Sequence, residues 1–154
     1  MIVVIGKSGQ LAKGLQNIAT QEVVCLGRNE INITDSRDIH SKLDVFQPQA
    51  VINASAYTAV DKAESEPELA FSLNETAVAN LAQYCSNNKI HFTHVSTDYV
   101  FSGSKGSPYK THDTYAPKSV YGESKMAGEK AIQVIGLDNA CIIRTSWVYS
   151  EYGQ

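Results

Sequence analysis

The stretch Ile2-Val3-Val4-Ile5-Gly6-Lys7-Ser8-Gly9-Gln10-Leu11-Ala12 decides the fold of this 154-residue chain. It opens with a continuous β-branched run, which is typical of a strand buried on both faces. Two glycines follow, and Leu11, Leu15 and Ile18 then recur at helical spacing. The stretch therefore predicts a strand that turns through glycines directly into a helix.

Glycines in this context are typical of a dinucleotide-binding turn. Gly6 would permit the tight turn, and Gly9 would let the backbone approach a pyrophosphate at the helix N-terminus. Ala12 stands where the pattern asks for a small residue so that helix and strand can pack closely. A plain strand–turn–helix connection is the alternative interpretation of the same residues.

Strand and helix patterns alternate along the whole chain. Apolar runs at residues 2–5, 23–26, 50–52, 92–95 and 140–143 are separated by helical patterns. Unbroken apolar strands that alternate with helices predict an α/β fold, a doubly wound parallel sheet of the Rossmann type with both faces covered. Residues 102–117 form the one long irregular stretch, and loops of that length are often functional.

Two of the expected helices carry apolar stripes. Ser65 begins a capping-box spacing with a proline in the first turn, and behind it residues step by four: Leu69, Leu73, Ala77, Leu81 and Cys85. The next helix is expected to bury Val120, Ala127, Ala131 and Val134 along one face. Earlier in the chain, Asp35 is expected to cap a helix at its N-terminus.

Composition narrows the possible partners. The net charge is −3 and there is no basic tract, so nucleic acid is not an expected partner. No apolar run is long enough to span a bilayer, and no membrane association is expected. The cysteines are three and widely spaced, which favours reduced thiols in a cytoplasmic protein. His91 and His94 should point to opposite faces of a strand, so no metal site is expected.

Candidate site residues follow three of the expected strands. Arg28, after the second strand, could accommodate the 2′-phosphate of NADP, or be a solvated surface residue. Small residues follow the third strand, and hydroxyls in Ser96-Thr97-Asp98-Tyr99 end the fourth. Such hydroxyls could bond a substrate carbonyl oxygen or merely cap the strand.

Tyr121 and Lys125 stand four residues apart on the expected helix that follows, and therefore on one face. An ammonium beside a phenol favours the phenolate, which would bring the pKa of the tyrosine towards neutral. A general acid or base works best when its pKa lies near the working pH. The order of glycine turn, strand-end hydroxyl and Tyr-x-x-x-Lys is one specific arrangement.

With these motifs, the chain resembles the dTDP-4-dehydrorhamnose reductase family of extended short-chain dehydrogenases/reductases. The resemblance runs from end to end and rests on four strings: Val51-Ile52-Asn53-Ala54-Ser55-Ala56-Tyr57-Thr58-Ala59-Val60-Asp61-Lys62-Ala63-Glu64, Ser96-Thr97-Asp98-Tyr99-Val100-Phe101, Tyr121-Gly122-Glu123-Ser124-Lys125-Met126-Ala127-Gly128-Glu129 and Arg144-Thr145-Ser146-Trp147-Val148-Tyr149. It implies reduction, by NADPH or NADH, of the C4 ketone of a nucleotide-linked 6-deoxy-4-keto sugar in dTDP-L-rhamnose biosynthesis.

The resemblance also implies roles for individual residues. Thr97, Tyr121 and Lys125 take the catalytic positions: Thr97 orients the carbonyl, Tyr121 donates the proton, and Lys125 lowers the pKa of Tyr121 and holds the nicotinamide ribose. Cofactor contacts are implied at Gly6, Gly9, Gln10, Leu11, Arg28, Asn32, Ile33, Ala54, Ser55, Ala56, Tyr121 and Lys125. Substrate contacts are implied at Thr58, Val60, Tyr99 and Trp147. Asn32 departs from the family, which usually has an aspartate there.

Members of that family continue well past Gln154. We therefore expect residues 1–154 to be an NAD(P)-binding Rossmann domain that stops before the substrate-binding region, with any homodimer formed through the absent part. Two alternatives stay open at this point. One is a non-catalytic, NADP-binding regulatory subunit that resembles methionine adenosyltransferase subunit beta. The other is an inactive cofactor-binding fragment.

Overall fold

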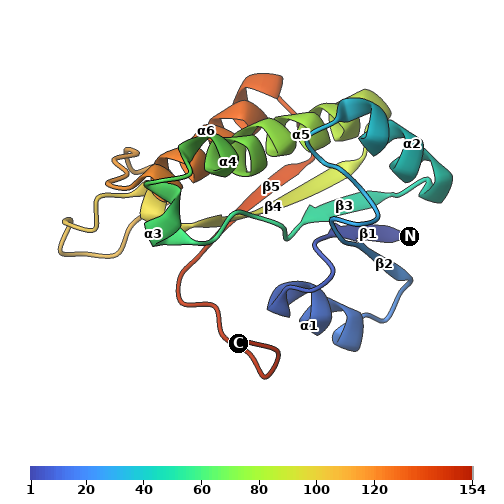
Figure 1. The fold of residues 1–154 in the computed structure, drawn as a ribbon, viewed down its shortest axis with the longest axis horizontal. Coiled ribbons are helices and arrows are strands. Elements are labelled where there is room, and N and C mark those ends of the chain that lie inside the picture. Colours follow the sequence, from blue (N-terminus) through green and yellow to red (C-terminus); the bar gives the residue numbers. More distant parts are fainter. Residues whose placement is uncertain (154) are drawn as a thin grey trace.

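A five-stranded parallel sheet forms the centre of the computed structural model, which describes residues 1–153 (Figure 1). The strands lie in the order β2-β1-β3-β4-β5, and all neighbouring pairs are parallel. Their bounds are β1 (Ile2–Ile5), β2 (Val23–Leu26), β3 (Ala50–Asn53), β4 (His91–Thr97) and β5 (Ala140–Thr145). The predicted strands and the parallel α/β fold are confirmed.

Helices cover the sheet unequally. One face carries α2 (Ser36–Phe46), α4 (Pro67–Phe71), α5 (Ala77–Asn88) and α6 (Val120–Ile135), whereas the other carries α1 (Gln10–Ile18), seen below the sheet in Figure 1. The main core lies under the larger helical layer. The core under α1 is smaller and includes Val4, Ala12 and Cys25. On β5, Cys141 is exposed and Ile143 is 46% exposed, so coverage of both faces does not extend to this edge strand.

The connections reverse direction at β1. The chain passes from β1 to β2 on one side, then crosses to β3 on the other side of β1. In open parallel sheets, the crevice beyond the carboxyl ends of the strands at such a reversal is where ligands bind. The fold therefore places the turn after β1 and the loop after β3 at one ligand-binding edge.

The long helix predicted after Ser65 is interrupted. A π-helical turn, η1 (Ser72–Thr76), joins α4 to α5. Because a π turn holds an extra residue, it rotates the buried face. Leu69 is consequently 48% exposed, whereas Ala70 and Asn74 are buried. The predicted capping box is also wrong, since Ser65 Oγ donates to Lys62 O and Glu66 is the N-cap.

The predicted apolar stripe of α6 is mostly wrong, although Val120 does pack against the cluster of Tyr57, Ala63 and Ala70. Val134 is 86% exposed, and the buried face consists of Gly122, Ser124, Lys125, Gly128, Glu129 and Ile132. Close packing is the reason. A Cβ on Gly128 would run into Asn74 O of η1, and one on Gly122 would run into Tyr99 O. Small and polar residues therefore face inward on α6, because this helix approaches neighbouring backbone directly.

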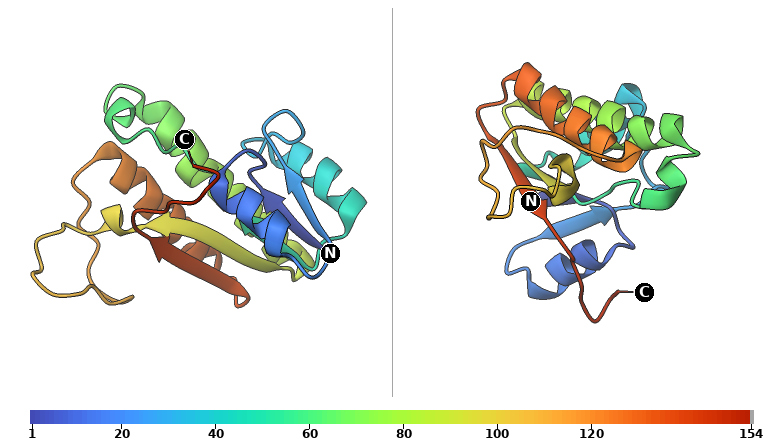
Figure 2. Two further views of the ribbon diagram at one scale, coloured as in Figure 1. Left: turned by 90° about the horizontal axis from the view of Figure 1, so that it is seen from below. Right: turned by 90° about the vertical axis from the view of Figure 1, so that its left-hand side faces the viewer.

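Short helices and loops follow the carboxyl ends of the strands and border the crevice at that edge of the sheet. Helix α3 (Val60–Ala63) follows the loop after β3, and the short 3-10 helix η2 (Asp98–Val100) follows β4. Residues 102–118 contain no helix or strand, as predicted for most of this stretch, and form the loop that projects at the left of Figure 2.

Asp35 caps α2, its Oδ1 accepting from Arg37 N at 2.9 Å, which confirms that prediction. No helix within residues 1–153 is long and apolar enough to cross a membrane.

Candidate active site

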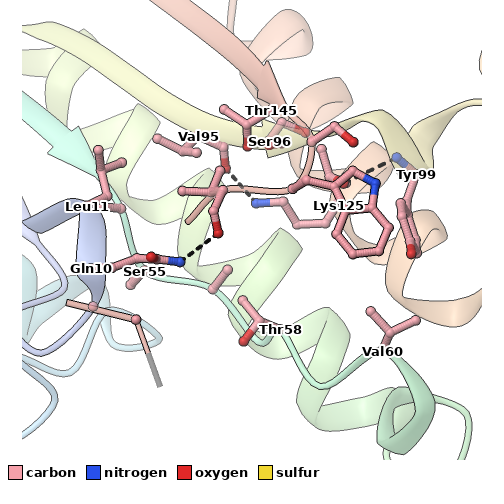
Figure 3. A pocket seen from close by; sticks show the side chains of 18 of the residues that line it. Gln10, Leu11, Ser55, Thr58, Val60, Val95, Ser96, Tyr99, Lys125 and Thr145 are labelled. Carbon is pink, nitrogen blue, oxygen red and sulfur yellow. Dashed lines mark hydrogen bonds between the residues drawn. The ribbon is translucent and has the colours of Figure 1, made fainter. Parts of the chain in front are cut away.

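A cavity of about 740 Å³ opens at the carboxyl edge of the sheet, where the connections reverse. Turns after β1, β3 and β5 line it, together with the end of β4 and the start of α6 (Figure 3). It brings together most of the predicted site residues, namely Gly9, Gln10, Leu11, Ala54, Ser55, Ala56, Thr58, Val60, Thr97, Tyr99, Tyr121, Lys125 and Trp147. Residues from distant parts of the sequence therefore share one site.

Four predicted cofactor residues lie outside this lining. Gly6 forms the turn itself: its φ is +111°, and a Cβ there would lie 3.2 Å from the backbone of Ala54. Arg28 is exposed, and Ile33 belongs to the hydrophobic core. Asn32 closes a local turn, in which its Oδ1 accepts from Thr34 N at 3.1 Å and Thr34 Oγ1 at 2.7 Å. The cavity as it stands does not reach the end of β2.

The N-terminus of α1 is open towards the cavity. Gly9 is the N-cap, no side chain caps the helix, and its first turn holds no acidic residue. A Cβ on Gly9 would meet nothing within 4 Å. Free amide groups and the positive end of a helix dipole favour an anion at such a place. The structure therefore has room and donors for a phosphate group in front of α1.

Thr97 and Tyr121 meet on the opposite side of the cavity. Thr97 Oγ1 donates to Asp98 Oδ1 and accepts from Tyr99 N, both at 3.2 Å. The rings of Tyr99 and Tyr121 pack edge to face with centroids 5.7 Å apart. Burial raises the pKa of Tyr121, and its hydrogen bond with Thr97 opposes that rise. The expected lowering by Lys125 is absent in this structure, and Tyr121 is held as a neutral phenol.

Lys125 turns towards β4 rather than towards Tyr121. Its Nζ donates to Val95 O at 2.7 Å and lies 3.3 Å from His94 Nε2. The residue is 2% exposed. Burial lowers the pKa of Lys125 to about 8, and the carboxylate of Glu129 opposes this shift. Lys125 is therefore a buried amine that can titrate close to physiological pH.

Two buried polar residues lie behind the cavity, and the sequence did not predict their contact with each other or with Lys125. His94 and Asn53 are both fully buried, and Asn53 Nδ2 lies 3.2 Å from His94 Nδ1. His91 is exposed, which confirms that the two histidines point to opposite faces. Spacing alone could not link His94 to Lys125, because its partners come from a different strand and a later helix.

A second buried network supports the same helix. Glu129 is fully buried and pairs with Arg144 at 2.6 Å. It also accepts from Ser96 Oγ at 2.5 Å and from Tyr115 Oη at 2.7 Å. This network ties α6 to β4, β5 and the long loop, and it keeps the carboxylate of Glu129 fully hydrogen-bonded.

The side of the cavity that the segment after β5 forms is more exposed. Trp147 is 90% exposed and has a φ of +52°. Gln10 Nε2 donates to Val148 O at 2.9 Å, so the segment after β5 crosses to α1, as Figure 2 shows. The three cysteines are free, and within residues 1–153 no cluster of His, Cys, Asp or Glu could hold a metal ion.

Comparison with known proteins adds family information to this geometry. The family model described as "RmlD substrate binding domain" matches residues 1–154. A dTDP-4-dehydrorhamnose reductase from Sinorhizobium fredii is 43% identical over 99% of the chain and 52% of its own length. One from Salmonella typhimurium is 38% identical over 99% of the chain and 53% of its own length. The chain spans about half the length of the curated relatives it matches.

Solved structures agree with this pattern. A dTDP-4-dehydrorhamnose reductase from Bacillus anthracis, in complex with NADP, aligns with a TM-score of 0.95 and 31% identity. The alignment covers 99% of this chain and 55% of that one. A UDP-glucose 4-epimerase from Thermus thermophilus, in complex with NAD, has a TM-score of 0.78 at 20% identity and covers 94% of this chain and 54% of its own. That second likeness concerns the fold alone.

Proposed function

Because this chain belongs to the RmlD substrate binding domain family, we propose that it forms the cofactor-binding part of a dTDP-4-dehydrorhamnose reductase. The reaction is the NADPH- or NADH-dependent reduction of the C4 ketone of dTDP-4-dehydro-L-rhamnose to dTDP-L-rhamnose. One observation carries the proposal: Thr97, Tyr121 and Lys125 line the same cavity as the open N-terminus of α1.

The cavity residues fit a dinucleotide. The amide groups of Gln10 and Leu11 at the start of α1 would hold the pyrophosphate, with Gly9 leaving room for it. Ala54, Ser55 and Ala56 would border the bound cofactor after β3. When bound, the cofactor supplies the hydride. The Bacillus anthracis reductase was crystallised in complex with NADP, which supports the same ligand class here. Arg28, exposed after β2, would be the residue that favours the 2′-phosphate.

Tyr121 would act as the proton donor. Reduction of a ketone needs a proton at the forming alkoxide oxygen, and the donor must be protonated beforehand. Burial raises the pKa of Tyr121, which keeps its phenol protonated at neutral pH. The Thr97 hydroxyl would hold the carbonyl oxygen, while Thr58, Val60, Tyr99 and Trp147 would border the sugar. Lys125 would hold the nicotinamide ribose.

The extent of the domain is also part of the proposal. Residues 1–154 would bind the cofactor, and a further region would complete the sugar-nucleotide site, since the matched relatives are about twice as long. A homodimer through such a region stays a prediction. A cytoplasmic compartment is supported by the free state of Cys25, Cys85 and Cys141.

Calorimetry and a reduction assay together test these proposals. We expect the 154-residue chain to bind NADPH, and the Tyr121→Phe variant to retain binding. In any form of the protein that reduces dTDP-4-dehydro-L-rhamnose, the same substitution should lower kcat by about 10²–10⁴-fold. Unchanged turnover would refute the role of Tyr121, and failure of the folded chain to bind NADPH would refute the cofactor proposal.

A further inference from the structure

Behind the cavity, three buried side chains form a line from β3 through β4 to α6. Asn53 contacts His94, and His94 contacts Lys125, at 3.2 and 3.3 Å respectively. None of the three is more than 2% exposed. Because these side chains are buried, their polar atoms form hydrogen bonds with one another and with nearby backbone. The known donors and acceptors therefore determine which atoms carry the hydrogens.

The orientation of Asn53 is set by the backbone. Asn53 Oδ1 lies 3.1 Å from Ser55 N and 2.8 Å from Ser55 Oγ. A backbone N–H can only donate, so the amide atom that faces it must be the oxygen. The amide nitrogen of Asn53 therefore points at His94, and it too can only donate.

The orientation of Asn53 selects one tautomer of His94. Its Nδ1 has to accept the hydrogen bond from Asn53, so a neutral ring carries its hydrogen on Nε2. The ring is neutral because burial holds its pKa well below the usual range, and any positive charge on Lys125 adds to that lowering. The Nε2–H group therefore faces Lys125 Nζ.

A donor that faces Lys125 distinguishes the two forms of the amine. An ammonium group has three N–H donors and no lone pair, so it cannot accept from His94 Nε2–H. A neutral amine can accept from Nε2–H while it donates to Val95 O at 2.7 Å. The neutral form satisfies every group of the line, whereas the charged form sets two donors against each other.

We propose that His94 is a positioning residue which, held in its Nε2–H tautomer by Asn53, favours the neutral amine of Lys125 in the ligand-free protein. His94 then adds to the effect of burial and lowers the pH above which Lys125 loses its positive charge; the consequence of this for the reaction rests on the proposed function. The protonation equilibrium itself is a property of the ligand-free chain.

The other charged and titratable groups around Lys125 act in known directions. Glu129, one turn further along α6, favours the ammonium, but its carboxylate is already paired with Arg144 of β5. Tyr121, one turn earlier on α6, is held neutral by burial. Asp98 of η2 accepts from Thr97 and Ser146. From β3, the line receives only the uncharged Asn53. His94 is thus the neighbour that directly opposes a charge on Lys125.

Nuclear magnetic resonance on the ligand-free chain tests the tautomer first. Nitrogen-15 shifts of the histidine rings distinguish Nδ1–H from Nε2–H, and they need no substitution at the site. We expect His94 to be neutral at pH 7 with its hydrogen on Nε2. A neutral Nδ1–H ring, or a charged ring, would overturn the inference.

A titration of ¹³Cε-labelled lysine then measures the pKa of Lys125, whose signal is assigned by its loss in Lys125→Met. His94→Gln replaces the ring by an amide that can turn its oxygen to Nζ, so we expect the pKa of Lys125 to rise by about one unit, a tenfold change in proton affinity. His91→Gln is the matched control on the exposed face of β4 and should leave it unchanged. An unchanged or lower pKa in folded His94→Gln would overturn the role of His94. Both measurements are made without NADPH or substrate. The inference about His94 and the proposed function can therefore fail independently of each other.

Discussion

Replacing Gly128 by alanine is expected to destabilise this protein strongly, although alanine is the better helix former. Gly128 is buried within α6, where it packs against Asn74 of the π-helical turn η1 and Val78 of α5. An added Cβ would stand well inside the roughly 3.5 Å of an ordinary carbon contact to Asn74 O. A backbone oxygen cannot rotate away as a side chain can, so either α6 or η1 must move.

The expected magnitude has three parts. Overpacking costs about 1–3 kcal/mol. Displacing η1 also strains Asn74, whose buried side chain bonds Tyr57 N, Tyr57 O and Ser124 Oγ, and a lost bond of this kind costs about 1–3 kcal/mol. The helix propensity of alanine returns about 1 kcal/mol. We expect a net loss of about 3 kcal/mol, or roughly 6–12 °C in Tm for a chain of this size.

Urea unfolding followed by circular dichroism measures this loss, and Gly14→Ala is its matched control. Gly14 also lies inside a helix, α1, but a Cβ there would meet nothing within 4 Å. This control should gain about 0.5–1 kcal/mol from helix propensity alone. The reasoning is refuted if Gly128→Ala is neutral or stabilising, or if the two variants lose stability equally.

Three further predictions concern stability. Gly6→Ala places a side chain at φ +111° against the backbone of Ala54 and should cost about 1–3 kcal/mol in urea unfolding; a neutral result would contradict the strain. Arg144→Met leaves the buried Glu129 carboxylate without its cation and should lower the free energy of unfolding by about 3 kcal/mol. Adding Glu129→Gln removes the unpaired charge and should restore part of that loss. Equal stability of Arg144→Met and the unaltered protein would contradict this prediction. In the folded protein the pKa of Lys125 is lowered to about 8, so above that pH the folded chain loses a proton that the unfolded chain still holds. The free energy of unfolding, relative to that of Lys125→Met, should therefore rise between pH 8 and 9 by up to about 1.4 kcal/mol per pH unit. Parallel stability curves for the two proteins would exclude the lowered pKa.

The sheet was predictable because its signals are local. Each strand is a short apolar run, and the turn at Gly6 joins the first of them to a helix within a few residues. The helical faces were harder to predict, because burial there depends on neighbours that are distant in sequence. Nothing local in Ser72–Thr76 indicates a π turn, and the small residues of α6 carry no apolar stripe even though they pack most closely.

Most residues of the cavity lining were predictable from the sequence, but their protonation was not. Tyr121 and Lys125 were found by their spacing, and both line the cavity. The direction of each pKa was not accessible, since burial dominates both shifts and burial is a property of the assembled fold. Arg28 and Asn32 illustrate the opposite case, in which a motif position lies outside the cavity lining: Arg28 is exposed, and the Asn32 side chain closes a local turn.

The parallel register has a consequence for the time course of folding. Every strand pairs with a segment far away in the chain, as Ile2 does with Ala50 and Phe92 with Ala140. Non-local pairings of this kind fold slowly, because long loops must close before the contacts form. Gln10 and Trp147 stand far apart in the sequence yet share one cavity wall. The cavity therefore forms late during synthesis. Its wall is incomplete until β5, the last of the five strands in the chain, has left the ribosome and paired with the sheet.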